Sequence, residues 1–257
     1  MTNIFDTHAH YTDRRFAQDQ ARVLRDLPGH GVNLILTCGS DMRDSAAALA
    51  LAREYPHVYA ACGVHPHEAN QVSGIRNQEL GELRKLLQDD RCVALGEIGL
   101  DYHYDFSPRE VQKDVFRFQL QLAMELDMPV IIHDREAHKD TLHILRELKG
   151  LRGVIHCFSG SLEFAREILA LGLYIGFGGA VTFRNAKRPL AVAAEIPLNR
   201  LLLETDAPYM APEPFRGSRC ESPHIAQIAE KIAEAREMKA QELIDICCEN
   251  GRRLFEI

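Results

Sequence analysis

The sequence contains no apolar segment long enough to cross a membrane, and its start lacks the basic region, apolar run and cleavage site of a secretory signal. We therefore expect a cytoplasmic protein without membrane contacts. Low-complexity stretches and runs of like charge are also missing, so the whole chain should fold. Its 257 residues, 46% of them hydrophobic, suffice for one large core, and we expect a single domain over residues 1–257. The oligomeric state is left open, and a monomer is compatible with the sequence.

The sequence has fewer basic than acidic residues, with 30 Lys and Arg against 37 Asp and Glu. The formal net charge of −7 disfavours broad, non-specific adhesion to duplex phosphate, which needs a cationic face, so any contact with nucleic acid should be local. The seven cysteines cannot all pair, and most lie in apolar runs where a thiol packs as a small hydrophobic group. Disulfide bonds are not expected.

Short apolar runs alternate with longer segments of helical periodicity. The runs are nearly continuous in Val, Ile, Leu, Cys and Ala, which is typical of strands buried on both faces of a parallel sheet. Eight strands are predicted, over residues 4–7, 32–37, 58–64, 93–97, 129–133, 154–158, 173–177 and 201–205. Amphipathic helices are predicted between them, for example over residues 41–55, 108–126, 136–149 and 161–171.

This α/β alternation is compatible with a doubly wound open sheet or with a closed barrel. Eight βα units within about 200 residues favour the (β/α)₈ TIM barrel. Two further helices, predicted over residues 223–237 and 240–254, should pack onto that barrel.

Side chains of metal-ligand type gather where the predicted strands end, and this is where TIM barrels carry their catalytic groups. In an extended strand His8 and His10 lie on one face, about 7 Å apart at the backbone, so both imidazoles can converge on one ion. The His-x-His pair alone could be chance. It gains weight because other strand ends carry Glu97, His133, His156 and Asp206.

Six potential ligands are thus expected at one mouth of the barrel. Imidazole together with carboxylate suits Zn²⁺, Mn²⁺, Co²⁺ or Ni²⁺, whereas Mg²⁺ usually prefers oxygen-rich sites. The sequence does not choose among these five ions.

The motifs resemble those of the TatD-like metal-dependent deoxyribonucleases of the amidohydrolase superfamily. The resemblance runs in order from about residue 4 to the end of the chain, which makes it far more specific than any single motif. It is carried by residues 6–10 (DTHAH), 63–66 (GVHP), 96–102 (GEIGLDY), 129–133 (PVIIH), 156–160 (HCFSG), 182–186 (TFRNA), 203–209 (LETDAPY) and 250–255 (NGRRLF).

The resemblance implies a TIM-barrel hydrolase with two divalent ions and 3′ to 5′ exonuclease activity on DNA. It implies that His8, His10 and Asp206 hold one ion, that His133 and His156 hold the other, and that Glu97 bridges the two. Two such cations can lower the pKa of a water from 15.7 to about 7 and stabilise charge on a phosphodiester. Many barrel relatives bridge their metals with a carbamylated lysine on strand four, where this chain has glutamate.

Among the carboxylates, Asp206 is the best candidate for the general base, and Glu97 is the second residue assigned to catalysis. Glu204 and Asp101 are candidates for orienting the ligand imidazoles, although a structural role explains them equally well.

Substrate phosphate should meet cationic groups besides the metals, and the candidates are His65, Arg135 and Arg216. The sequence departs from the family just after Arg216. The family commonly has Arg-Gly-x-x-Asn-x-Pro here, whereas this chain has Cys220 at the Asn position and one extra residue before the Pro. The departure concerns substrate preference and leaves the predicted metal ligands untouched.

Three functions remain open on these residues. The first is the two-metal phosphodiesterase acting on DNA, which Glu97 and the motifs favour. The second is a related hydrolase of another ester or amide, which the acidic charge balance favours. The third is a non-catalytic protein that keeps a structural metal, and a complete set of six ligands with a candidate base argues against it.

Overall fold

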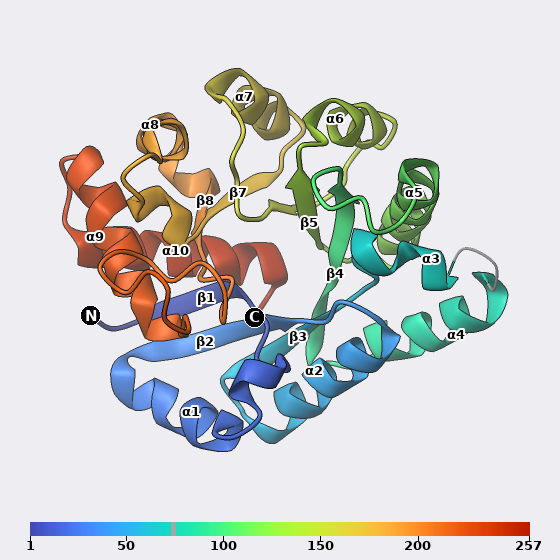
Figure 1. Ribbon diagram of the computed structural model, residues 1–257, viewed down its shortest axis with the longest axis horizontal. Coiled ribbons are helices and arrows are strands. Elements are labelled where there is room, and N and C mark those ends of the chain that lie inside the picture. The colour runs from blue at the N-terminus through green and yellow to red at the C-terminus, as the bar shows by residue number, and fades with distance from the viewer. Residues whose placement is uncertain (73–75) are drawn as a thin grey trace.

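The computed structural model describes residues 1–72 and 76–257, and it folds into a barrel of eight parallel strands surrounded by helices (Figure 1). The strands follow one another around the barrel in chain order, as predicted. They are β1 (Ile4–Ala9), β2 (Val32–Cys38), β3 (Val58–Cys62), β4 (Cys92–Asp101), β5 (Val130–Arg135), β6 (Gly153–Ile155), β7 (Tyr174–Phe177) and β8 (Leu201–Leu203).

The helices follow the strands in the expected βα order. They are α1 (Gln20–Asp26), α2 (Met42–Glu54), α3 (Ala69–Val72), α4 (Arg76–Leu87), α5 (Arg109–Glu125), α6 (His138–Arg146), α7 (Leu162–Ala170), α8 (Lys187–Glu195), α9 (Ile225–Ala235) and α10 (Ala240–Phe255). Local capping fixes several starts: the Asp41 side chain accepts the backbone N–H of Asp44 at α2, and Ser161 accepts that of Phe164 at α7. No helix in these two described stretches combines the length and apolar character that a membrane span requires.

The barrel closes between its first and last strands, close to the predicted site. The backbone N–H of His10 donates to the carbonyl of Ala207 (2.6 Å), and that of Asp206 donates to the carbonyl of His8 (2.9 Å). These bonds bring the end of β1 against the segment that follows β8. The (β/α)₈ TIM barrel is thereby confirmed.

Two sets of buried apolar side chains hold the barrel together. One fills its interior with residues from all eight strands, such as Leu36, Ile131 and Leu202, and reaches the C-terminal part of α10. There Phe255 meets Phe5 edge to face, with ring centroids 6.0 Å apart. The other set lies between the strands and the surrounding helices. Both final helices pack as predicted: α10 contacts β1 and β8, and α9 contacts β8 and α10.

Seven of the eight strands end one to four residues away from the predicted position, and three of these differences concern the site. β4 continues to Asp101, because Ile98 to Asp101 pair in register with Ile132 to Arg135 of β5. β6 and β8 end earlier, at Ile155 and Leu203, so His156 and Asp206 lie just beyond their strands. The β4 pairing shifts register between Leu95 and Ile98, and this irregularity holds Glu97 at the barrel mouth.

Candidate metal centre

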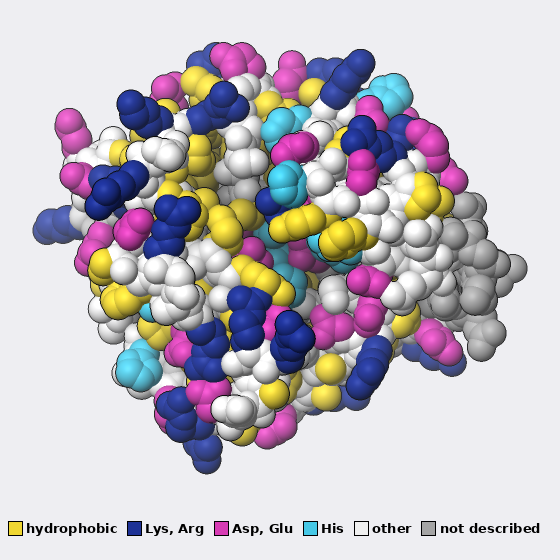
Figure 2. Space-filling model, in the orientation of Figure 1, with side chains coloured by type: hydrophobic (Ala, Val, Ile, Leu, Met, Phe, Trp, Pro, Cys, Tyr) yellow, Lys and Arg dark blue, Asp and Glu magenta, His cyan; other side chains and the backbone are white. Residues whose placement is uncertain are grey.

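A pocket of about 900 Å³ opens at the C-terminal ends of the strands. Figure 2 shows it as a hollow near the middle of this face, with histidine and acidic side chains inside and hydrophobic side chains on its rim. Five of the six predicted ligands line it: His10, Glu97, His133, His156 and Asp206. The sixth, His8, is fully buried beneath them.

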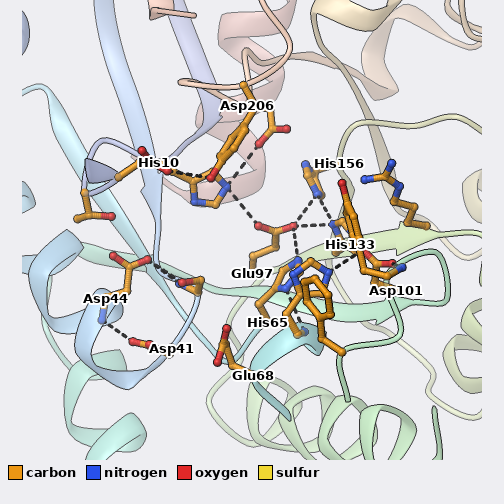
Figure 3. A pocket seen from close by; sticks show the side chains of 18 of the residues that line it. His10, Asp41, Asp44, His65, Glu68, Glu97, Asp101, His133, His156 and Asp206 are labelled. Carbon is orange, nitrogen blue, oxygen red and sulfur yellow. Dashed lines mark hydrogen bonds and ion pairs between the residues drawn. The ribbon is translucent and has the colours of Figure 1, made fainter. Parts of the chain in front are cut away.

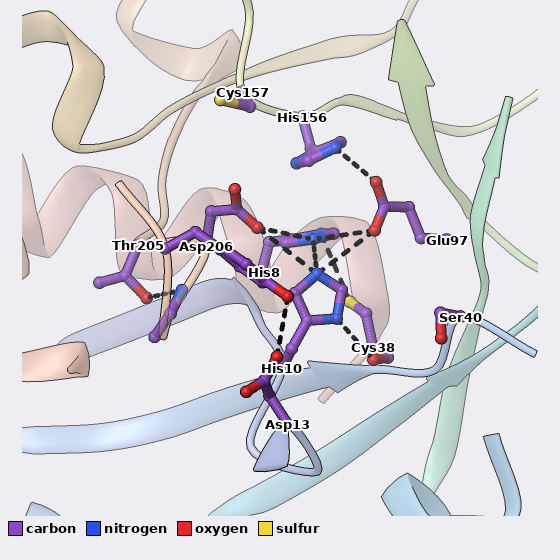
Figure 4. A network of polar contacts seen from close by, with 12 residues as sticks. His8, His10, Asp13, Cys38, Ser40, Glu97, His156, Cys157, Thr205 and Asp206 are labelled. Carbon is purple, nitrogen blue, oxygen red and sulfur yellow. Dashed lines mark hydrogen bonds and ion pairs between the residues drawn. The ribbon is translucent and has the colours of Figure 1, made fainter. Parts of the chain in front are cut away.

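The two histidines at the C-terminal end of β1, His8 within the strand and His10 just after it, face one another. Their Nε2 atoms are 3.1 Å apart, and Oδ1 of Asp206 lies 3.8 Å from Nε2 of His8 and 3.4 Å from that of His10 (Figure 4). The Nδ1 atom of His10 must donate to the Cys38 carbonyl at 2.9 Å, because that oxygen can only accept. Nδ1 of His8 lies 3.4 Å from the Cys38 thiol. Both rings therefore turn Nε2 toward the carboxylates.

Glu97 stands between two groups of imidazoles (Figure 3). Its Oε2 lies 3.4 Å from Nε2 of both His8 and His10. Its Oε1 lies 2.8 Å from Nδ1 of His133 and 2.8 Å from Nε2 of His156. Burial alone would raise the pKa of Glu97, but the surrounding imidazoles, His156 foremost, hold that pKa well below its usual range. The carboxylate is ionised and offers one oxygen to each group.

The second group of imidazoles, His133 and His156, also contacts carboxylates on the side away from Glu97. Nδ1 of His133 is 3.2 Å from Nε2 of His156, and the far nitrogen of His133, Nε2, lies 3.2 Å from Oδ2 of Asp101. The far nitrogen of His156, Nδ1, lies 3.5 Å from Oε1 of the buried Glu204. Asp101 and Glu204 thus stand where a partner that orients a ligand imidazole is needed.

This arrangement fits divalent cations. Each of the four histidines has one ring nitrogen beside an outer partner and the other directed at Glu97 or Asp206. Three overlapping groups bring their ligand atoms within 4.8 Å of one another: His8, His10 and Asp206; His8, Glu97 and His156; and His65, Glu97 and His133. Imidazole nitrogens and carboxylate oxygens converging in this way are the usual donors for Zn²⁺, Mn²⁺, Co²⁺ or Ni²⁺.

Asp206 is held by its backbone rather than by a strand. Its φ of 58° is in the left-handed region, which is uncommon for a residue other than glycine. The bond from its N–H to His8 and the one from the N–H of Tyr209 to its carbonyl (2.8 Å) fix this conformation. Burial would raise the pKa of Asp206, but the hydrogen bond with His10 outweighs burial and lowers that pKa, so the carboxylate stays ionised.

The three predicted phosphate contacts lie in different surroundings. Arg135 ends β5 and lines the pocket. His65 lines it as well, but its Nε2 is 3.5 Å from Oε1 of Glu97, and burial lowers its pKa to about 4. Its ring is neutral at neutral pH and lies where a metal ligand would. Arg216 stacks on Phe183 (4.3 Å from Cζ to the ring centroid) and is not among the described side chains that line the pocket.

Several lining residues were not among the predicted site residues. His67 lines the pocket and places Nε2 2.9 Å from Oδ2 of Asp101. His67 lies two residues after His65, which is the same spacing as that between His8 and His10, so the sequence did carry a signal for it. Tyr104, Phe106 and Tyr209 line the rim. Tyr209 belongs to the motif at residues 203–209, whereas for Tyr104 and Phe106 the sequence offers no signal, because only the fold brings their loop to the pocket.

Comparisons with known proteins identify the family and confirm the fold. The family model for TatD related DNase matches residues 5–256. The "Uncharacterized metal-dependent hydrolase YabD" of Bacillus subtilis is 43% identical over 99% of both chains. The "3'-5' ssDNA/RNA exonuclease TatD" of Erwinia tasmaniensis is 37% identical over 99% of this chain and 100% of that protein. The crystal structure of YJJV, a TatD homologue from Escherichia coli K12, superposes with a TM-score of 0.90 at 34% identity, over 99% of this chain and 98% of the other.

Proposed function

Because this chain belongs to the TatD related DNase family of metal-dependent hydrolases, we propose that it is a two-metal 3′ to 5′ exonuclease acting on single-stranded DNA. The observation that carries the proposal is the position of Glu97, which offers one oxygen to each of two histidine groups. The direction of digestion and the preference for single strands are inferred from a relative that is 37% identical and is named a 3'-5' ssDNA/RNA exonuclease.

In this proposal His8, His10 and Asp206 hold one divalent ion, His133 and His156 hold the other, and Glu97 contacts both. His65 is close enough to Glu97 to add a further nitrogen to the second site. Two divalent cations bound here would lower the pKa of a water from 15.7 to about 7 and stabilise charge on the attacked phosphodiester. The protein contributes the fixed directions of its imidazole nitrogens, because their outer partners hold the rings in place.

Asp206 is the proposed general base. Its carboxylate is ionised, its Oδ1 lies 3.4 Å from His10, and its side chain is 18% exposed, so it can accept a proton from water that enters the pocket. Arg135 is the proposed phosphate contact. Among the described residues that line the pocket, it is the one that carries a guanidinium or ammonium group. Arg216 could meet only a more distant phosphate.

A second candidate is a hydrolase of another ester or amide. The observation in its favour is the acidic side of the pocket, which is lined by Asp13, Asp41, Asp44 and Glu68 and would repel a polyanion that crossed it. A nucleic acid strand would therefore have to approach from the side of Arg135. A small neutral substrate would meet no such restriction.

The test is to incubate the protein, loaded with Mn²⁺, with end-labelled single-stranded DNA, duplex DNA and RNA and to follow product lengths. We expect stepwise shortening from the 3′ end, fastest on single strands, and loss of this activity in an Asp206→Ala variant. Shortening from the 5′ end or internal cuts would refute the direction, and no cleavage of any of the three would favour the second candidate. Wild-type hydrolysis by Asp206→Ala would refute the role given to that carboxylate.

A further inference from the structure

Exposed aromatic side chains gather at the rim of the metal pocket. Among the described residues, the large hydrophobic side chains with the greatest exposure are Met1, Tyr104, Phe106, Met124, Tyr209 and Phe215, and three of these six line the pocket: Tyr104, Phe106 and Tyr209. Phe106 is 64% exposed and Tyr104 is 48% exposed. Apolar surface concentrated at a site of this kind indicates a ligand that covers it.

Tyr104 and Phe106 form an ordered stack. Their ring centroids are 5.3 Å apart with an interplanar angle of 23°. His67 supports both rings by edge contacts, at 5.4 Å from Tyr104 and 4.8 Å from Phe106. The guanidinium of Arg135 lies 4.8 Å from the Tyr104 ring centroid. The stack is therefore an aromatic surface with a cation over its Tyr104 ring.

The loop that carries this stack is fixed in advance. Oδ1 of Asp101 accepts the backbone N–H groups of His103 and Tyr104, both at 2.9 Å. The buried side chain of Gln112 accepts the N–H of Asp101 (2.8 Å) and donates to the carbonyl of Ser107 (2.8 Å). The two ends of the loop are thus held by one side chain. A ligand that stacks on these rings spends little binding energy on ordering them.

The same carboxylate connects the stack to the metal centre. While Oδ1 of Asp101 holds the loop, its Oδ2 lies 3.2 Å from Nε2 of the candidate ligand His133 and 2.9 Å from Nε2 of His67. The stack consequently stands beside the group formed by His65, Glu97 and His133. On the other side, Tyr209 stands next to His10, at 6.2 Å between ring centroids, and Arg15 covers one face of its ring at 3.8 Å.

We propose that the Tyr104–Phe106 stack binds a nucleobase next to the scissile phosphodiester, and that it is the feature of the pocket that selects single strands. The inference rests on the proposed nuclease function. An aromatic face stacks on any base, whatever its hydrogen-bonding edge, so the site should be tolerant of sequence. A base in a duplex is stacked between its neighbours and is not available to the ring. Arg135, beside Tyr104, is placed to meet the phosphate of the same nucleotide.

The test compares two single-stranded oligonucleotides that differ only in their last two 3′ nucleotides, which are normal in one and lack their bases in the other. The wild-type protein with Mn²⁺ should cleave the normal strand with a kcat/KM roughly 10- to 100-fold higher, the range expected for one stacked base. A Tyr104→Ala/Phe106→Ala variant should lose this preference and cleave both strands at the wild-type rate for the strand without bases. Phe215→Ala removes an aromatic ring that is 42% exposed but does not line the pocket, and it should keep the preference.

A spectroscopic measurement checks the contact itself. The fluorescence of 2-aminopurine is quenched when the base stacks on an aromatic ring, and a strand that carries it near the 3′ end should be quenched by the wild-type protein and by Phe215→Ala. Phe106→Ala alone should weaken this quenching, and because this ring is mostly exposed its removal should leave the fold intact. A Tyr104→Trp variant, which keeps an aromatic ring at this position, should quench the fluorescence at least as strongly as the wild-type protein.

The outcomes separate the two proposals. If the wild-type protein cleaves neither strand, the nuclease function is wrong. If it cleaves both strands equally well, or if Tyr104→Ala/Phe106→Ala keeps the wild-type preference while its thermal unfolding is unchanged, the nuclease function stands and the base-stacking site is wrong.

Discussion

The Asp101→Asn substitution tests how the second metal position is built. The Asp101 carboxylate accepts at Oδ2 from Nε2 of His133, and this leaves Nδ1 of His133 free to face Glu97. An asparagine keeps the size of the side chain, and its Oδ1 can still accept the backbone N–H groups of His103 and Tyr104. Its amide nitrogen, however, can only donate. His133 would then have to accept at Nε2 and carry its proton on Nδ1, which is the nitrogen a cation needs.

The expected effect is on one metal and not on the fold. Loss of a partner that orients a ligand imidazole lowers metal affinity by roughly 10- to 100-fold, which corresponds to about 1.4–2.7 kcal/mol. Titration calorimetry with Mn²⁺ should show this loss at one of two positions. The position formed by His8, His10 and Asp206 should keep its affinity, because Asp101 contacts none of these residues in the described structure.

A matched control is Asp140→Asn. Asp140 accepts a hydrogen bond from the hydroxyl of Tyr102 at 2.7 Å, close to the same loop, but it contacts no candidate metal ligand among its described partners. The Asp140→Asn variant should bind both ions as the wild-type protein does. The reasoning is refuted if Asp101→Asn binds both ions with wild-type affinity, or if Asp140→Asn weakens one of them equally.

The remaining predictions concern the first metal position and the core. His8→Ala and His10→Ala should each leave about one ion per chain in elemental analysis, because both histidines are assigned to the position that they form with Asp206; loss of both ions in either variant would contradict this assignment. Burial lowers the pKa of His10, but Asp206 and Glu97 outweigh burial and raise it to about 10, so at neutral pH a metal must displace a proton. Affinity for the first ion should therefore rise with pH, by up to about tenfold per unit below pH 10, and calorimetry in two buffers should detect a released proton; affinity that is flat between pH 6 and 8 would refute the shift. Phe116→Ala, on the buried face of α5, should lower the free energy of unfolding by about 3–5 kcal/mol in urea and leave the metal affinities unchanged, and a change in those affinities would show that the core and the site are not independent.

The sequence was sufficient to predict the barrel because each strand is buried on both faces and therefore reads as a continuous apolar run. It was less informative about where strands end. β4 runs on to Asp101 because β5 offers a partner for each further residue, and such pairing depends on a neighbour that is distant in the chain. The same limit applies to His156, which was placed within a predicted strand and lies just beyond β6, and to Asp206, which follows the end of β8 by three residues instead of directly.

At the site, the sequence predicted which residues gather but not how each one is directed. That His10 binds the Cys38 carbonyl through Nδ1, and that His133 faces Glu97 through Nδ1 instead of Nε2, depends on partners from other strands. His65 was expected to meet phosphate as a cation. In the structure burial lowers its pKa to about 4, and its ring lies beside Glu97. The stacked rings of Tyr104 and Phe106 could not be predicted, because an exposed aromatic residue in a loop has no periodicity.

The most direct test of the two-metal site is the anomalous diffraction of a crystal of this protein grown with Mn²⁺. We predict two peaks per chain, one beside Nε2 of His10 and one beside Nδ1 of His133, with Glu97 in contact with both. A single peak, or two peaks of which one is out of reach of Glu97, would contradict the proposed site.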